Sequence, residues 1–192
     1  MKVHFTASNF NLAEHYDDFA AIVNHIKKNG HILTREWIDE DLARQQHDRE
    51  YTFEEYRAIW QKVKMSIIEA DLVIVEGWNN SYSIGYQTAF ALSYKKPVLV
   101  LAPNTKISHT IIAGEDNPFL HIVHYTRENL GKVLDEFFLK YQPTGKEMRF
   151  NMFIDRETQV YLDMESYKTG KTKAKIIRDL IKREMDKNDG LS

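Results

Sequence analysis

The chain has 192 residues, of which 43% are hydrophobic and 28% charged, and its formal net charge is -2. These values suit a soluble protein of one domain plus a small appendage, and the low net charge gives no general electrostatic attraction to nucleic acid or membrane. Because the sequence has no cysteine, disulfides, thiolate catalysis and cysteine-based zinc sites are excluded.

The chain begins with an alternation of strand and helix patterns. Residues 3–7 predict a short strand. Apolar residues spaced three and four apart predict a helix over residues 12–28. The Asn29-Gly30 pair that follows is predicted to end this helix. Residues 32–33 begin a second strand.

A charged segment and a well-marked helix follow. Residues 35–50 have no clear apolar period, and we expect a mobile, partly helical excursion over the edge of a sheet. Thr52 and Glu55 have the spacing of a capping box, which predicts the start of a helix that continues to residue 69.

The most informative stretch is residues 70–103, which has the pattern of a strand, a polar loop, a helix and a strand. Both strands, at residues 72–75 and 98–101, are apolar on both faces, as in the centre of a parallel sheet. The helix between them opens with small polar residues and a glycine: Asn79, Asn80, Ser81, Ser83 and Gly85. Its N-terminus is therefore expected at the carboxyl edge of the sheet, where such sheets bind ligands and where helix N-termini favour anions.

The remaining elements complete one domain. A loop over residues 104–119 precedes a strand at residues 121–125, and Thr126 is predicted to cap a final helix. Strands that alternate with helices indicate an α/β domain over residues 1–141, with a five-stranded, mostly parallel, doubly wound sheet of Rossmann-like type. Residues 142–147 have the composition of a linker.

The pattern changes after the linker. Residues 148–154 alternate between apolar and other side chains, as in a half-buried strand. Asp155 is predicted to cap one helix, Gly170 to end it, and Thr172 to cap another. The last helix is predicted to turn four apolar residues inward: Ile176, Ile177, Leu180 and Ile181. So small a unit cannot bury a core alone, so we expect it to dimerise.

This alternating strand, the Asp155 cap, the Gly-Lys-Thr turn and the apolar stripe resemble a ribbon-helix-helix module over residues 148–188. The resemblance implies a homodimer, or a higher even-numbered homo-oligomer, in which paired strands enter the major groove of double-stranded DNA. It implies that the DNA-binding residues are Arg149, Asn151, Phe153, Lys171, Thr172 and Lys173. Phe153 departs from the polar or basic residue usual at its position, so a module that only dimerises is an open alternative.

The segments ADLVIVE, SYSIGYQTAFAL and KKPVLVL resemble the nucleoside 2-deoxyribosyltransferase-like superfamily, and the resemblance extends over residues 1–141. Its members have a Ser-x-Gly-x-Gly-Tyr-Glu type of turn, in which the glutamate attacks the anomeric carbon of the sugar. Here Gln87 stands at the glutamate position and Ser83 replaces the first glycine, while residues 62–64 lack an acidic residue that the family carries. An amide is not a carboxylate nucleophile, so we expect a site that binds without cleaving.

The expected ligand-binding residues are Thr6, Ser8, Trp78, Ser81, Ser83, Gly85 and Gln87. We expect His4 near this pocket and Trp60 in the core. A displaced carboxylate could come from Glu76, at the end of its strand, or from the acidic residues of segment 35–50.

The sequence thus favours a dimeric, non-catalytic sensor or transcriptional regulator that binds a nucleotide or nucleoside-like ligand and DNA. Two alternatives stay open: an active N-glycosidase or deoxyribosyltransferase with a displaced carboxylate, and a protein that uses the ribbon for assembly only. The eight histidines have no metal-ligand spacing, and we expect neither a metal nor a cofactor. Without a signal-peptide pattern or a membrane-spanning stretch, we expect a cytoplasmic protein with no membrane partner.

Overall fold

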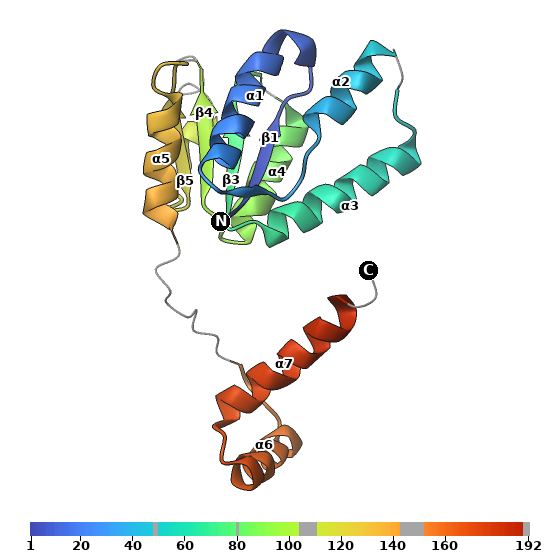
Figure 1. The fold of residues 1–192 in the computed structure, drawn as a ribbon, viewed down its shortest axis with the longest axis vertical. Helices are drawn as coiled ribbons and strands as arrows, with labels where there is room; N and C mark the ends of the chain where they lie inside the picture. The colour runs from blue at the N-terminus through green and yellow to red at the C-terminus, as the bar shows by residue number, and fades with distance from the viewer. Residues whose placement is uncertain (48–49, 80, 104–110, 143–151, 190–192) are drawn as a thin grey trace. The chain divides into compact units, whose positions relative to one another are not determined.

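Figure 1 shows the fold as a computed structural model. The structure describes residues 1–47, 50–79, 81–103, 111–142 and 152–189. The chain divides into two compact units, Met1–Thr144 and Gly145–Ser192, and each is described by itself. Among the described residues, none of the helices has both the length and the apolar character that crossing a membrane requires.

The first unit is built on a parallel five-stranded sheet, as predicted. Its strands are β1 (Lys2–Ala7), β2 (Ile32–Leu33), β3 (Leu72–Glu76), β4 (Val98–Ala102) and β5 (Leu120–His124). They lie in the order β2-β1-β3-β4-β5, and every neighbouring pair is parallel. The chain therefore reverses its direction of winding between β1 and β3, and a crevice forms at such a point.

Helices cover both faces of this sheet (Figure 1). They are α1 (Leu12–Lys28), α2 (Ile38–Gln46), α3 (Phe53–Glu69), α4 (Tyr82–Ser93) and α5 (Leu130–Tyr141), with a short 3-10 helix, η2, at Ile111–Gly114. One core cluster joins α1 and α5 to the sheet, with Phe19 and Leu134 fully buried. A second cluster joins α3 and α4 to the other face, around Ile67 and Ala91.

The alternation of side chains along each strand determines which residues share a face of the sheet. Phe5 of β1 and Ile74 of β3 belong to the cluster of α1 and α5, whereas Val73 and Val75 belong to that of α3 and α4. Since successive side chains point to opposite faces, His4 lies on the α3/α4 face and Glu76 on the α1/α5 face.

Most predicted helix ends are confirmed, with one difference. Thr52 caps α3 through a complete capping box, and Gly30 follows α1 with a positive φ of 74°. The segment 35–50, predicted to be partly helical, contains the regular helix α2. The prediction that Thr126 caps the last helix of the unit was wrong, because α5 begins at Leu130 with Asn129 as its N-cap residue.

The second unit is a helical hairpin of α6 (Arg156–Thr169) and α7 (Lys173–Asp189). The Asp155 carboxylate accepts the Thr158 N–H at 2.7 Å, and Gly170 ends α6 with φ 67°. The Thr172 hydroxyl accepts the Lys175 N–H at 3.3 Å. These observations confirm the three predicted helix ends.

The strand predicted for this unit is not seen among its described residues, and the predicted apolar stripe is only partly buried. Residues 148–151 lie outside the described residues, and residues 152–154 form no strand in the single chain. The side chain of Ile176 is buried, but the predicted inward residues Leu180 and Ile181 are 40% and 55% exposed. A single hairpin has only one opposing helix, so it cannot cover the whole stripe.

Candidate functional site

A hollow of about 320 Å³ lies between the carboxyl end of β1 and the start of α4, the helix that follows β3, and we call it the β1/β3 hollow. It lies where the strand order reverses, the usual ligand position in open α/β sheets. Five of the predicted ligand-binding residues line it: Thr6, Ser8, Ser81, Ser83 and Gln87. Segments far apart in sequence thus contribute to one polar surface.

Gln87 reaches the hollow from the second turn of α4 and contacts β1. Its Oε1 lies 3.3 Å from Nε2 of His4, which is fully buried. Burial lowers the pKa of His4 to about 4, so the imidazole is neutral at pH 7 and holds one N–H. The His4 Nδ1 atom makes a short contact with the Ser66 hydroxyl.

The start of α4 offers polar groups that the helix itself does not use. Ser81 is the N-cap residue, yet its side chain makes no capping hydrogen bond. The Ser83 side chain is exposed in the first turn. The first N–H groups of a helix lack partners within the helix, and its positive dipole end favours an anion. This end of the hollow therefore suits a negatively charged ligand group.

Asp41 of α2 also lines the hollow, and its side chain is buried. Its Oδ1 accepts a 2.6 Å hydrogen bond from the Tyr51 hydroxyl, and its Oδ2 accepts one of 3.1 Å from Asn9. Burial and this hydrogen bond raise the pKa of Tyr51 to about 12. Sequence reasoning placed Asp41 among several acidic residues of a loop, because only the fold of α2 singles it out.

Trp60 packs against the core cluster of α3 and α4, as predicted, but it is only partly buried and also forms part of the wall of the hollow. Its ring is half-buried and packs against Tyr86 and Phe90, with centroid distances of 4.9 and 5.8 Å. The helical spacing in the sequence placed Trp60 on the inner face of α3, but did not show that this face also borders the hollow.

Trp78, Gly85 and Glu76 are not among the residues that line the hollow. The Trp78 ring lies against His15 at 3.6 Å between centroids. Glu76 accepts hydrogen bonds from the Trp78 N–H at 3.1 Å and the Tyr125 hydroxyl at 3.0 Å. Burial raises the pKa of Glu76 to about 7. Trp78 and Glu76 belong to the α1/α5 face of the sheet, whereas Gly85 lies in α4.

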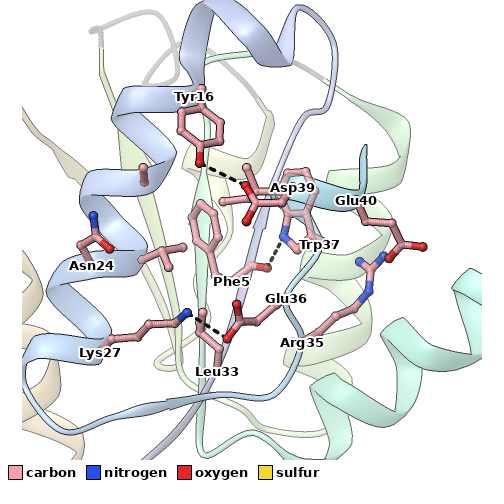
Figure 2. Close-up of a pocket in the computed structure, with 13 residues that line it drawn as sticks. Phe5, Tyr16, Asn24, Lys27, Leu33, Arg35, Glu36, Trp37, Asp39 and Glu40 are labelled. Carbon is pink, nitrogen blue, oxygen red and sulfur yellow. Dashed lines mark hydrogen bonds and ion pairs between the residues drawn. The ribbon is translucent and has the colours of Figure 1, made fainter. Parts of the chain in front are cut away.

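A second hollow, of about 340 Å³, lies between α1 and residues 33–40 (Figure 2). Lys27 and Glu36 form an ion pair of 2.9 Å, and the Tyr16 hydroxyl donates a 3.0 Å hydrogen bond to Asp39. The first contact joins α1 to the segment that leads into α2, and the second joins α1 to the first turn of α2. They therefore support the position of α2, which carries Asp41 into the β1/β3 hollow.

The residues predicted to bind DNA are only partly described. Arg149 and Asn151 lie outside the described residues, and Phe153 is fully exposed. Lys171 forms an ion pair of 2.7 Å with Asp179, and Lys173 forms one of 2.5 Å with Asp163. Thr172 accepts the Lys175 N–H, as described above. A DNA phosphate would compete with the two carboxylates for these lysines.

Comparison with known proteins supports the resemblance of the first unit. No protein-family model matches the chain. The chain is 26% identical over 140 residues to the protein named "Putative 2'-deoxynucleoside 5'-phosphate N-hydrolase 1" of Nematostella vectensis, covering 71% of this chain and 93% of that protein. In fold it is similar to the CMP N-glycosidase BcmB of Clostridium botulinum, with a TM-score of 0.50, 12% identity, and coverage of 71% and 99%.

Both proteins are of the nucleoside deoxyribosyltransferase-like superfamily. The chain is thus similar to this class of proteins in sequence and in fold. Neither protein provides support for a ribbon-helix-helix module.

Proposed function

We propose that the first unit binds a nucleotide or nucleoside-like molecule in the β1/β3 hollow and holds it without cleaving it. The observation that carries the proposal is Gln87, a neutral carboxamide that lines the hollow and contacts His4. By resemblance, the superfamily has its nucleophilic glutamate at this position. The names of the two similar proteins support a nucleotide as the ligand class.

The polar and aromatic groups of the hollow suit the parts of a nucleotide. The hydroxyls of Ser81 and Ser83, with the N-terminal amides of α4, suit a phosphate. The rings of Trp60 and Tyr56 offer surfaces on which a base could stack. Gln87, which follows Ser83 by about one turn of α4, is then assigned to the sugar.

One observation favours an active N-glycosidase as a second candidate. Asp41 is the only carboxylate that lines the hollow among the described residues. A carboxylate there could stabilise an oxocarbenium-like centre. However, both its oxygens already accept hydrogen bonds, from Tyr51 and Asn9. Glu76 lies away from the hollow, so Asp41 replaces it as the carboxylate of this alternative.

The experiment is a paired binding and turnover assay. Purified protein is titrated with the four common deoxynucleoside 5'-monophosphates and CMP by calorimetry, then incubated with each while free base is followed by chromatography. Saturable binding of at least one, with no base release, is expected. Base release that disappears in Asp41→Asn but persists in the control Glu54→Gln, at an exposed position of α3, would establish the enzyme instead. No binding at all would contradict the proposal.

For the second unit, we propose that two copies associate through the apolar residues that the single hairpin leaves exposed. They include Tyr161, Met164, Leu180, Ile181 and Met185. Water-exposed apolar side chains on both helices are what a partner hairpin would cover. The resulting dimer would be the form that binds DNA.

DNA binding by this dimer stays a prediction, and the ion pairs of Lys171 and Lys173 with carboxylates oppose it. The test titrates genomic DNA fragments with the protein at low and moderate salt. A shift that weakens with salt and is lost in the double variant Arg149→Ala, Lys173→Ala is expected. No shift at low salt would leave assembly as the role of the unit.

A further inference from the structure

We infer that His4 is a positioning residue that fixes the Gln87 carboxamide as a hydrogen-bond donor toward the β1/β3 hollow. The site therefore selects a ligand that presents an acceptor atom, such as a ring oxygen or carbonyl oxygen, at Gln87. This inference deepens the proposed function and depends on it for the ligand class.

The direction of the hydrogen bonds follows from a chain of polar groups on the α3/α4 side of the sheet. The carboxamide oxygen of Gln87 faces Nε2 of His4, and an oxygen of this kind only accepts, so the neutral imidazole holds its proton on Nε2. His4 Nδ1 is then an acceptor, and the Ser66 hydroxyl is the donor in contact with it. The Ser66 oxygen can in turn accept from Thr34, whose single hydroxyl proton is within reach of Ser66 at 3.2 Å and of the Val3 carbonyl oxygen at 3.4 Å.

The Nε2–H group of His4 then faces Gln87 at 3.3 Å. Because the carboxamide oxygen accepts this proton, the NH2 group turns away from His4. That NH2 group has no hydrogen-bond partner in the part of the chain that the structure describes. Since Gln87 lines the hollow, two N–H donors are presented to whatever fills it.

The fixed orientation of the Gln87 carboxamide determines which of its atoms a ligand meets. An unrestrained carboxamide can rotate to offer either its oxygen or its NH2 group to a ligand. Buried polar groups left unpaired are costly, so a fixed donor rejects a ligand that presents another donor. His4 thus determines which ligand atoms fit beside Gln87.

The first arm of the test measures the tautomer and needs no ligand. Protein labelled with ¹⁵N-histidine is examined by long-range ¹H–¹⁵N correlation spectra at pH 7, and the His4 signals are assigned from their loss in His4→Phe. A protonated Nε2 and an unprotonated Nδ1 are expected. Protonation at Nδ1, or at both nitrogens, would overturn the inference.

The second arm measures affinity for the deoxynucleoside monophosphate that binds best. His4→Phe removes the donor and is expected to weaken binding about 5-fold. His4→Gln, whose side-chain amide reaches about as far as Nε2, is expected to stay within about 2-fold of the natural protein. Equal losses in both variants, or none in either, would contradict the role of His4. If the natural protein binds no nucleotide, the proposed function fails, while the tautomer still decides the orientation of Gln87.

Discussion

The Tyr125 hydroxyl, just after β5, donates a 3.0 Å hydrogen bond to Oε1 of Glu76 at the end of β3. The Glu76 side chain is 1% exposed, and burial raises its pKa from 4.5 to about 7. Between these two values the folded protein binds more protons at Glu76 than the unfolded chain does. Ionisation of Glu76 therefore removes stability as pH rises from about 4.5 to 7, by up to about 3 kcal/mol.

Glu76→Gln should abolish this loss, since glutamine keeps the shape without a charge. The variant is expected to match the natural protein at pH 5 and to exceed its stability by about 1–3 kcal/mol at pH 8. Urea unfolding followed by tryptophan fluorescence checks this, because all three tryptophans lie in the first unit.

The comparison must be between variants, because other groups contribute to the same profile. Burial lowers the pKa of His4 to about 4, so that residue makes stability rise between about pH 4 and 6.5. Glu69→Gln, at a 52% exposed side chain in an ion pair with Lys2, serves as the control and should follow the natural protein. An identical pH profile in Glu76→Gln would show that Glu76 is ionised without cost.

Lys96 is predicted to stabilise the end of α3. Its ammonium donates hydrogen bonds to the carbonyl oxygens of Ile68 at 2.7 Å and Ala70 at 2.6 Å. Lys96→Met keeps the apolar stem but leaves both carbonyls without this donor, at an expected cost of about 1–3 kcal/mol in unfolding free energy. Lys62→Met, on the exposed side of α3, should change the stability by less than about 0.5 kcal/mol. Similar urea midpoints for the two variants would refute this prediction.

The sheet could be predicted from the sequence because its strands carry a strong local signal. The apolar runs around Ile74 and Leu99 are long enough to mark central strands, and right-handed crossovers then limit the topology. The start of α5 was misplaced because Asn129 and Thr126 are both good capping residues, and local preference does not choose between them.

The site was less predictable, because its members meet only in three dimensions. The Ser81 to Gln87 segment could be placed at the sheet edge, since one strand and one helix determine its position. Asp41 could not be placed, because its burial depends on contacts with Tyr51 and Asn9. Neither contact leaves a recognisable pattern in the sequence. Trp78 lies just after β3, yet its ring packs on His15. The sequence does not indicate on which face of the sheet this ring lies.

The second unit should lose its self-association when its exposed apolar stripe is charged. Leu180→Lys with Ile181→Lys is expected to weaken dimerisation at least about 10-fold, since each buried leucine or isoleucine contributes about 1.5–3 kcal/mol. Helicity should persist, because both side chains are already exposed in the single chain. Sedimentation equilibrium measures the change, with Lys182→Ala as the control. A natural protein that is monomeric at all concentrations would contradict the proposed dimer.

Gln87→Glu should change the titration of His4, because it places a negative charge where the carboxamide oxygen now lies, 3.3 Å from Nε2. An opposite charge at this distance favours the imidazolium, so the pKa of His4 should rise from about 4 by at least about one unit. Proton NMR of the imidazole signals against pH measures it. Gln61→Glu adds the same charge at an exposed position of α3 and should leave the titration of His4 unchanged. An unaltered His4 titration in Gln87→Glu would mean that the two side chains are not in contact in solution, and the orientation of Gln87 would then have another cause.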